Sequence, residues 1–266
     1  MLKKVFLVLL IILAAAGCAQ KEQSSNMEEI KPAEKVELLI SAAASLTDSL
    51  EEIQTAYEKE HNQIKLSFNF GASGTLQQQI EQGAPVDLFL SAGKKQMTAL
   101  VEKQLIDNNQ QMNLLTNELV AVVPADTNIA VSKIEDITKS EVKKIAVGQP
   151  ETVPVGSYTK DSLTFYKLWD TIQTKTVFAK DVKQVLNYVE TGNTEVGFVY
   201  KTDALTSQKV KVAFSPDSKS YKPIEYPVGI VKATKHVKEA EEFYKFLQSK
   251  AAQDIFIKYG FSLPDK

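Results

Sequence analysis

The sequence predicts an α/β fold with two lobes, each a mainly parallel sheet flanked by helices, with a ligand cleft between them. Short apolar runs alternate with segments of helical periodicity, this alternation occurs in two separate parts of the chain, and a late segment returns to the first part. Alternating strands and helices are typical of parallel sheets, in which ligands gather at the carboxyl ends of the strands. We expect residues 36–117 plus 226–266 to form lobe 1 and residues 118–225 to form lobe 2.

The first part of lobe 1 begins with a continuous apolar run at 36–41, which favours a strand buried on both faces. Leu46, Leu50 and Ile53 recur at helical spacing after the first run, so a helix is expected there. The same plan then repeats. The expected elements are strands at 36–41, 64–70 and 87–91, with helices from Leu46 and at 75–82.

Two serines lie where predicted strands end. Ser45 separates the first strand from its helix, and Ser73 lies in the small-residue turn 71–74 after the second strand. Because the carboxyl ends of parallel strands share one edge of a sheet, both serines are expected at the ligand edge. Ser45 could instead serve only as a helix N-cap, and the turn could be an ordinary connection.

The second lobe follows the same alternation, and the chain then returns to the first. Its expected strands are at 119–123, 144–147, 176–178 and 195–200, followed by a returning strand at 226–232 and a helix at 237–247. Tyr158, Phe165 and Trp169 are expected in the core of lobe 2. Two α/β lobes joined by crossings near residues 117 and 225 indicate a hinged solute-binding protein that closes on its ligand.

The first residues have the pattern of a secretory signal peptide. Lys3 and Lys4 precede an apolar run at 5–16, which is too short to span a bilayer, and the run ends at Gly17-Cys18. Cys18 is the only cysteine, as in bacterial lipoproteins, so residues 1–17 are predicted to be removed and Cys18 to carry the lipid. Residues 18–35 are expected to form a polar tether that holds the protein at the extracytoplasmic face of the cell membrane.

The chain contains 31 lysines and no arginine. Without residues 1–17, 29 basic side chains face 33 acidic ones, so no nucleic-acid partner is predicted. An anion would have to be bound by Lys, hydroxyls, backbone N–H groups or helix N-termini. No catalytic triad is visible, and the protein is not expected to be an enzyme. A secreted serine hydrolase using Ser45 or Ser73 and a purely structural surface lipoprotein are the alternatives.

From about residue 38 to 263 the sequence resembles the periplasmic molybdate-binding proteins of bacterial ABC importers. Each matching segment is short, and the match depends on their order and spacing. The segments are Ala42–Thr47, Phe70–Leu76, Gln79-Ile80, Gly83–Phe89, Ala146–Gly148, Pro154–Gly156, Asp181-Val182, Gly197–Tyr200, Asp203-Ala204, Tyr226–Val228 and Tyr259–Phe261. The resemblance implies the type II periplasmic-binding-protein fold.

The resemblance also implies an oxyanion site. Ser45 and Ser73 would donate through hydroxyl and backbone N–H, Val155 and Val182 through backbone N–H, and Tyr200 through its phenolic hydroxyl. Molybdate or tungstate would be held only as the oxyanion, with no protein ligand to the metal and no cofactor. Another tetrahedral oxyanion such as sulfate is the alternative ligand. The implied partners are an ABC permease and its ATPase, and the protein is expected to be a monomer.

A site made only of donors suits such a ligand. Molybdate is a tetrahedral dianion that carries no proton at neutral pH, so acceptor carboxylates would repel it. Desolvating the ion is costly unless each oxygen receives several hydrogen bonds. Helix N-termini supply both N–H groups and a favourable dipole.

Overall fold

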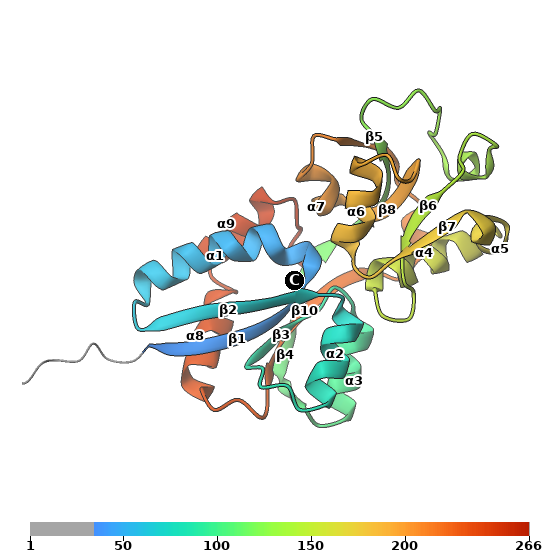
Figure 1. The fold of residues 1–266 in the computed structure, drawn as a ribbon. Coiled ribbons are helices and arrows are strands. Elements are labelled where there is room, and N and C mark those ends of the chain that lie inside the picture. Colours follow the sequence, from blue (N-terminus) through green and yellow to red (C-terminus); the bar gives the residue numbers. More distant parts are fainter. Residues whose placement is uncertain (1–34, 266) are drawn as a thin grey trace, which may run out of the picture. The chain divides into compact units, whose positions relative to one another are not determined.

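The computed structural model describes residues 35–265, and the unit Glu34–Lys266 is compact. The predicted signal peptide (1–17), the lipid-bearing Cys18 and all of the tether except its last residue lie outside the described residues. Within 35–265, no helix combines the length and the apolar character needed to cross a membrane. The described residues form two five-stranded sheets with helices packed against them (Figure 1).

The first sheet has the strand order β2-β1-β3-β10-β4. Its strands are β1 (Val36–Ala43), β2 (Ile64–Gly71), β3 (Leu88–Leu90), β4 (Ile106–Asn117) and β10 (Ile224–Val231). β1 pairs in parallel with β2 and β3, whereas β10 runs antiparallel to both β3 and β4. The sheet is therefore mixed, because β10 enters it on the way back from the second sheet.

The second sheet repeats this arrangement with the order β7-β6-β8-β5-β9. Its strands are β5 (Leu119–Pro124), β6 (Ile145–Gly148), β7 (Thr176–Ala179), β8 (Val196–Tyr200) and β9 (Val210–Phe214). β6 is parallel to β7 and β8, and β5 is antiparallel to β8 and β9. β5 is the first strand that the chain forms after it leaves the first sheet. It is antiparallel to both of its neighbours, as β10 is in the first sheet.

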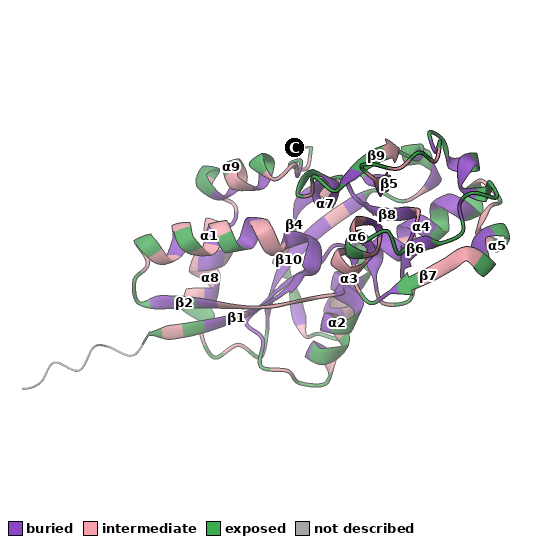
Figure 2. Cartoon of the chain, turned by 45° about the horizontal axis from the view of Figure 1, so that its top comes forward, coloured by how far each residue is buried: buried purple, intermediate pink, exposed green. Residues whose placement is uncertain are grey.

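Helices follow most of the strands. The α-helices are α1 (Thr47–Glu60), α2 (Ser73–Glu81), α3 (Lys94–Glu102), α4 (Pro154–Phe165), α5 (Trp169–Ile172), α6 (Val182–Glu190), α7 (Lys201–Leu205), α8 (Val237–Phe246) and α9 (Lys250–Lys258). Short 3₁₀ turns are η1 (Ala44–Leu46), η2 (Ile134–Thr138), η3 (Gln173–Lys175) and η4 (Ser218–Ser220). Figure 2 shows helices such as α1 with buried and exposed positions alternating along their length, as amphipathic helices require.

Strand alternation gives the first sheet an apolar layer on each face. In β3, Leu88 and Leu90 belong to the core cluster that includes α1 and α8, whereas Phe89 belongs to the cluster that includes α2 and α3. All three side chains are buried. The apolar run of β3 is therefore explained by a strand that is covered on both faces, as expected from the sequence.

The two-lobed type II fold is confirmed, with several differences from the sequence-based expectation. The sheets are mixed, since among the described strands antiparallel pairs are as many as parallel ones. Helix α2 begins at Ser73, two residues earlier than expected, and β10 begins at Ile224 rather than Tyr226. Phe165 was wrongly placed in the core: it lies at the last position of α4 with 60% of its surface exposed.

Candidate ligand-binding site

All five residues that the resemblance selects line one small cavity. The cavity has a volume of about 10 Å³ and takes residues from both sheets. Its lining consists of Ala43, Ala44, Ser45, Gly71, Ala72, Ser73, Ala92, Val153, Pro154, Val155, Val182 and Tyr200. This volume is about that of one water molecule and far below the range of pockets for drug-sized ligands, so only a solute of few atoms suits it, and the lining residues would have to move apart to admit one. The structure brings the five residues together, and their role as ligand donors stays a prediction.

Helix N-termini surround this cavity. Ser73 and Val182 are the first residues of α2 and α6, Val155 is the second residue of α4, and Ser45 lies in η1. The first N–H groups of a helix have no partner within it. Among the described residues, the backbone N–H groups of these four positions have no protein acceptor. The cavity is therefore lined by unused backbone donors at the positive ends of helix dipoles.

The hydroxyls of Ser45 and Ser73 have different hydrogen-bond partners. Ser73 Oγ accepts a hydrogen bond from the backbone N–H of Ala92 at 2.9 Å, and it is buried. Ser45 is not a helix cap, because no side-chain cap bond is found at the start of either η1 or α1. Its Oγ lies 2.9 Å from the hydroxyl of Tyr226, on β10. The N-cap interpretation of Ser45 is therefore wrong.

Tyr200 reaches across the cleft. It ends β8 of the second sheet, is 1% exposed, and donates its hydroxyl proton to the carbonyl of Ala92, after β3 of the first sheet, at 3.3 Å. Burial raises the pKa of Tyr200 well above its ordinary value, so the hydroxyl keeps its proton. A long bond of this kind is weak, so the proton could be redirected to a ligand in the cavity.

None of the described residues that line the cavity carries a charged side chain. A larger hollow of about 650 Å³ lies beside α3 and α4, but it is lined by both Lys and Glu side chains and by none of the five predicted residues. The smaller cavity therefore offers the chemistry expected from the sequence: neutral donors, with no acceptor carboxylate to repel an anion.

Comparisons with known proteins agree with this geometry. Residues 38–262 match the family described as "Bacterial extracellular solute-binding protein". The chain belongs to this family. A Bacillus subtilis relative named "Putative ABC transporter substrate-binding lipoprotein YvgL" is 49% identical, with 94% of each chain covered. The molybdate-binding protein ModA of Escherichia coli is 38% identical, with 87% of this chain and 91% of that protein covered.

Solved structures of solute-binding proteins have the same fold. The "substrate binding domain of putative molybdenum ABC transporter from Clostridium difficile" is 48% identical with a TM-score of 0.67, covering 87% of this chain and all of that one. The Azotobacter vinelandii periplasmic molybdate-binding protein has a TM-score of 0.78 at 23% identity, covering 86% of this chain and all of that one. At that identity the second likeness shows the fold alone.

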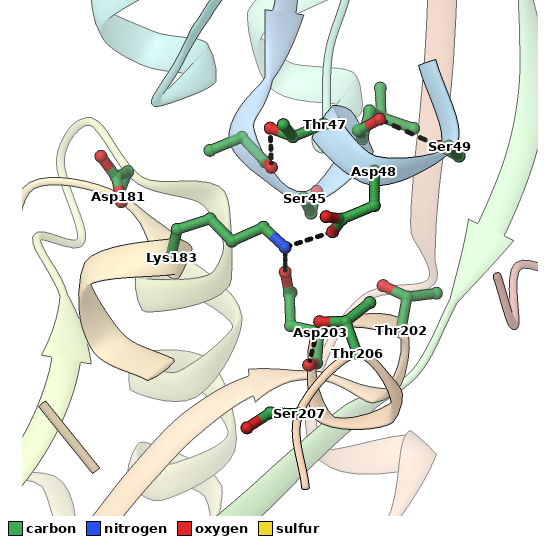
Figure 3. A network of polar contacts seen from close by, with 12 residues as sticks. Ser45, Thr47, Asp48, Ser49, Asp181, Lys183, Thr202, Asp203, Thr206 and Ser207 are labelled. Atoms are coloured by element: carbon green, nitrogen blue, oxygen red, sulfur yellow. Dashed lines mark hydrogen bonds and ion pairs between the residues drawn. The ribbon is translucent and has the colours of Figure 1, made fainter. Parts of the chain in front are cut away.

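In this solute-binding protein the two lobes touch across the cleft. Gly74 N–H at the start of α2 donates to the carbonyl of Thr152, before α4, at 2.9 Å. Lys183 of α6 forms an ion pair with Asp48 of α1 at 2.5 Å, and its Nζ lies 3.8 Å from Asp203 of α7 (Figure 3). The lobes are therefore held together by a backbone hydrogen bond and by an ion pair.

Asp203 is the destabilising member of this bridge. Its side chain is fully buried, and its carboxylate oxygens accept no hydrogen bond from the described residues. Burial raises its pKa to about 7, and the nearby Lys183 opposes this shift. The native protein therefore holds a proton that the unfolded chain has lost between about pH 4 and pH 7, so this carboxyl lowers stability progressively as the pH rises through that range.

Replacing Asp203 with asparagine is expected to remove this pH dependence. The gain in the free energy of unfolding, relative to wild type, should be larger at pH 8 than at pH 5 by about 2 kcal/mol. Chemical denaturation at both pH values measures it, and Asp161→Asn at an exposed position of α4 is the control. An Asp203→Asn gain that is the same at both pH values would contradict the assignment.

Sequence reasoning missed three groups that support the site. Tyr226 contacts Ser45, Asn117 contacts Tyr226, and the backbone of Ala92 binds both Ser73 and Tyr200. Tyr226 stood within a matched segment of the resemblance but received no role. Nothing in the pattern marked Asn117 or Ala92, because their roles depend on contacts between segments far apart in the chain.

Proposed function

We propose that this solute-binding protein captures molybdate, and equally tungstate, in the small cavity between its lobes and delivers the ion to an ABC permease driven by its ATPase. The lipid on Cys18 would hold the protein at the outer face of the cell membrane. No cofactor is needed for this function, and the molybdenum would be held only through its oxygens. One molecule of the protein would suffice to complete the site.

The observation that carries the proposal is the set of neutral donors from both lobes around one cavity. Ser45 and Ser73 lie on the first lobe, and Val155, Val182 and Tyr200 lie on the second. Each hydrogen bond to a charged acceptor contributes about 1.5 to 3 kcal/mol. Because the donors belong to both lobes, the ion completes its shell of hydrogen bonds only when the lobes are together. Binding would therefore favour closure.

Selectivity within tetrahedral dianions would come from size. Molybdate and tungstate have nearly the same size and charge, so a cage of hydrogen bonds should hardly distinguish them. Sulfate is smaller, and a cage fitted to the larger ion would stretch its bonds to sulfate. Relatives that share over a third of their residues with this chain are named molybdate-binding proteins, which supports the larger ions over sulfate.

The serine hydrolase alternative receives little support from the contacts. A nucleophilic serine needs a base within hydrogen-bond reach. Among the described residues, Ser45 Oγ contacts a tyrosine hydroxyl and Ser73 Oγ contacts a backbone N–H, and neither contacts a histidine or a carboxylate. We therefore propose binding without turnover.

Ser73→Ala is expected to weaken molybdate binding by about 10- to 100-fold, because one hydrogen bond to the ion is lost. Stability should fall by only about 1 kcal/mol, since the N–H of Ala92 loses its acceptor. Isothermal titration calorimetry measures the first effect and chemical denaturation the second. Gln78→Ala, at an exposed position of the same helix, is the control. An affinity equal to that of wild type would remove Ser73 from the site.

A further inference from the structure

A chain of hydrogen bonds runs from the crossing between the lobes to the cavity. Asn117 is the last residue of β4, and its Oδ1 accepts a hydrogen bond from the backbone N–H of Glu118 at 2.8 Å. A backbone N–H can only donate, so this contact fixes which side of the amide is oxygen. The amide nitrogen then faces Thr202 Oγ1 at 3.0 Å and the Tyr226 hydroxyl at 3.3 Å.

The Tyr226 hydroxyl therefore receives a proton from one neighbour and passes its own to another. An amide N–H₂ has no acceptor capacity, so Tyr226 accepts from Asn117 and cannot donate to it. Burial raises the pKa of Tyr226 well above its ordinary value, so the hydroxyl keeps its proton. Ser45 Oγ, at 2.9 Å, is an acceptor within reach of that proton.

Ser45 in turn must direct its own proton elsewhere. Its Oγ accepts from Tyr226, and Ser45 lines the cavity. Ser73 Oγ likewise accepts a hydrogen bond from the protein, in its case from the backbone N–H of Ala92. Each serine hydroxyl thus already accepts one hydrogen bond from the protein and keeps one further lone pair, and its O–H is left to donate into the cavity.

We infer that Tyr226 and Asn117 are positioning residues that fix Ser45 as a donor and thereby make the site select oxyanions that carry no proton. This inference rests on the proposed function and deepens it. An anion such as hydrogen phosphate brings its own O–H, which needs an acceptor. Where both serine hydroxyls turn their O–H groups toward the ion, that proton faces donors instead of an acceptor, at the cost of a buried unsatisfied group.

The test compares sulfate with hydrogen phosphate, because these dianions have nearly the same size and differ by one proton. Their affinities for the full-length protein are measured at pH 8 by competition with molybdate in a calorimeter. Tyr226→Phe keeps the ring, which packs edge-on against Tyr200 and Phe261, and removes only the hydroxyl. Ser45 Oγ is then free to accept the phosphate proton, and the ratio of sulfate to phosphate affinity should fall about tenfold.

A second variant, at Asn117, reverses the direction of the hydrogen bonds instead of removing one of them. In Asn117→Asp a carboxylate accepts where the amide donated, so the Tyr226 proton turns toward the new carboxylate and leaves Ser45 Oγ free. The added charge weakens both dianions alike, so the ratio of their affinities still isolates the direction of the hydrogen bonds. The same fall in the ratio is expected. Tyr221→Phe is the matched control, because the Tyr221 hydroxyl accepts from Leu119 N–H outside the cavity lining.

The possible results distinguish failure of this inference from failure of the proposed function. A lower sulfate-to-phosphate ratio in Tyr226→Phe or Asn117→Asp, with no change in Tyr221→Phe, supports the inference. Wild-type protein that binds molybdate, together with variants that bind it and keep the wild-type ratio, would overturn the inference and leave the proposed function standing. Wild-type protein that binds none of these anions would overturn the proposed function and the inference with it.

Discussion

Gly74→Ala is expected to lower the affinity for molybdate by about 100-fold, about 3 kcal/mol, while the unliganded protein remains folded. A Cβ at this position would lie 2.6 Å from the carbonyl oxygen of Thr152 and 2.8 Å from its Cα. These are backbone atoms of the other lobe, so no side chain can turn aside to make room. The lobes would have to separate, and the bond from Gly74 N–H to Thr152 would be lost.

Calorimetry measures the affinity of Gly74→Ala, and small-angle X-ray scattering shows whether molybdate still closes the protein. Thr75→Ala changes the adjacent, exposed side chain of the same helix and serves as the control. Melting of the unliganded variant within a few degrees of wild type would show that the lobes still fold. Wild-type affinity in Gly74→Ala would mean that this contact is not part of the ligand-bound form.

Gly156→Ala is expected to lower the free energy of unfolding by about 3 kcal/mol or more. Its Cβ would lie 1.9 Å from the carbonyl oxygen of Gly148, the last residue of β6. Helix α4 would have to move away from the sheet. Because Val155 precedes Gly156 in that helix, the same movement would displace a predicted ligand donor and weaken molybdate binding.

Chemical denaturation of Gly156→Ala tests the stability effect. Ser157→Ala, one residue further along α4, adds no atom beside β6 and should stay within about 0.5 kcal/mol of wild type. Equal stability of the two variants would show that α4 can shift without cost, which the close packing of Gly156 against Gly148 argues against.

The fold was predictable where apolar patterns are strong. β1 and β3 are buried on both faces, so their sequences are continuous apolar runs. β4 was not predicted, although it is the longest strand described, because its sequence IDNNQQMNLLTN has few apolar residues. As the edge strand of its sheet it has one neighbour, β10, and much of its length is exposed or half-buried. An edge position removes the pattern that sequence reasoning depends on.

The site was predictable to different extents for different residues. Ser45 and Ser73 could be placed at the ligand edge from strand, turn and helix alone. Val155 and Val182 could not, because their predicted contribution is a backbone N–H and any residue type except proline supplies one. Only the resemblance selected them. The supporting contacts of Tyr226 and Asn117 depend on how β4 and β10 pair, which no local pattern encodes.

The central claim is that a cavity lined by neutral donors binds molybdate and tungstate in preference to smaller or protonated oxyanions. Calorimetric titration of residues 34–266, stripped of bound anions, with molybdate, tungstate, sulfate and phosphate tests it most directly. We expect tight one-to-one binding of the first two ions and much weaker binding of the others. Equal affinity for sulfate, or no heat with any of the four, would contradict it.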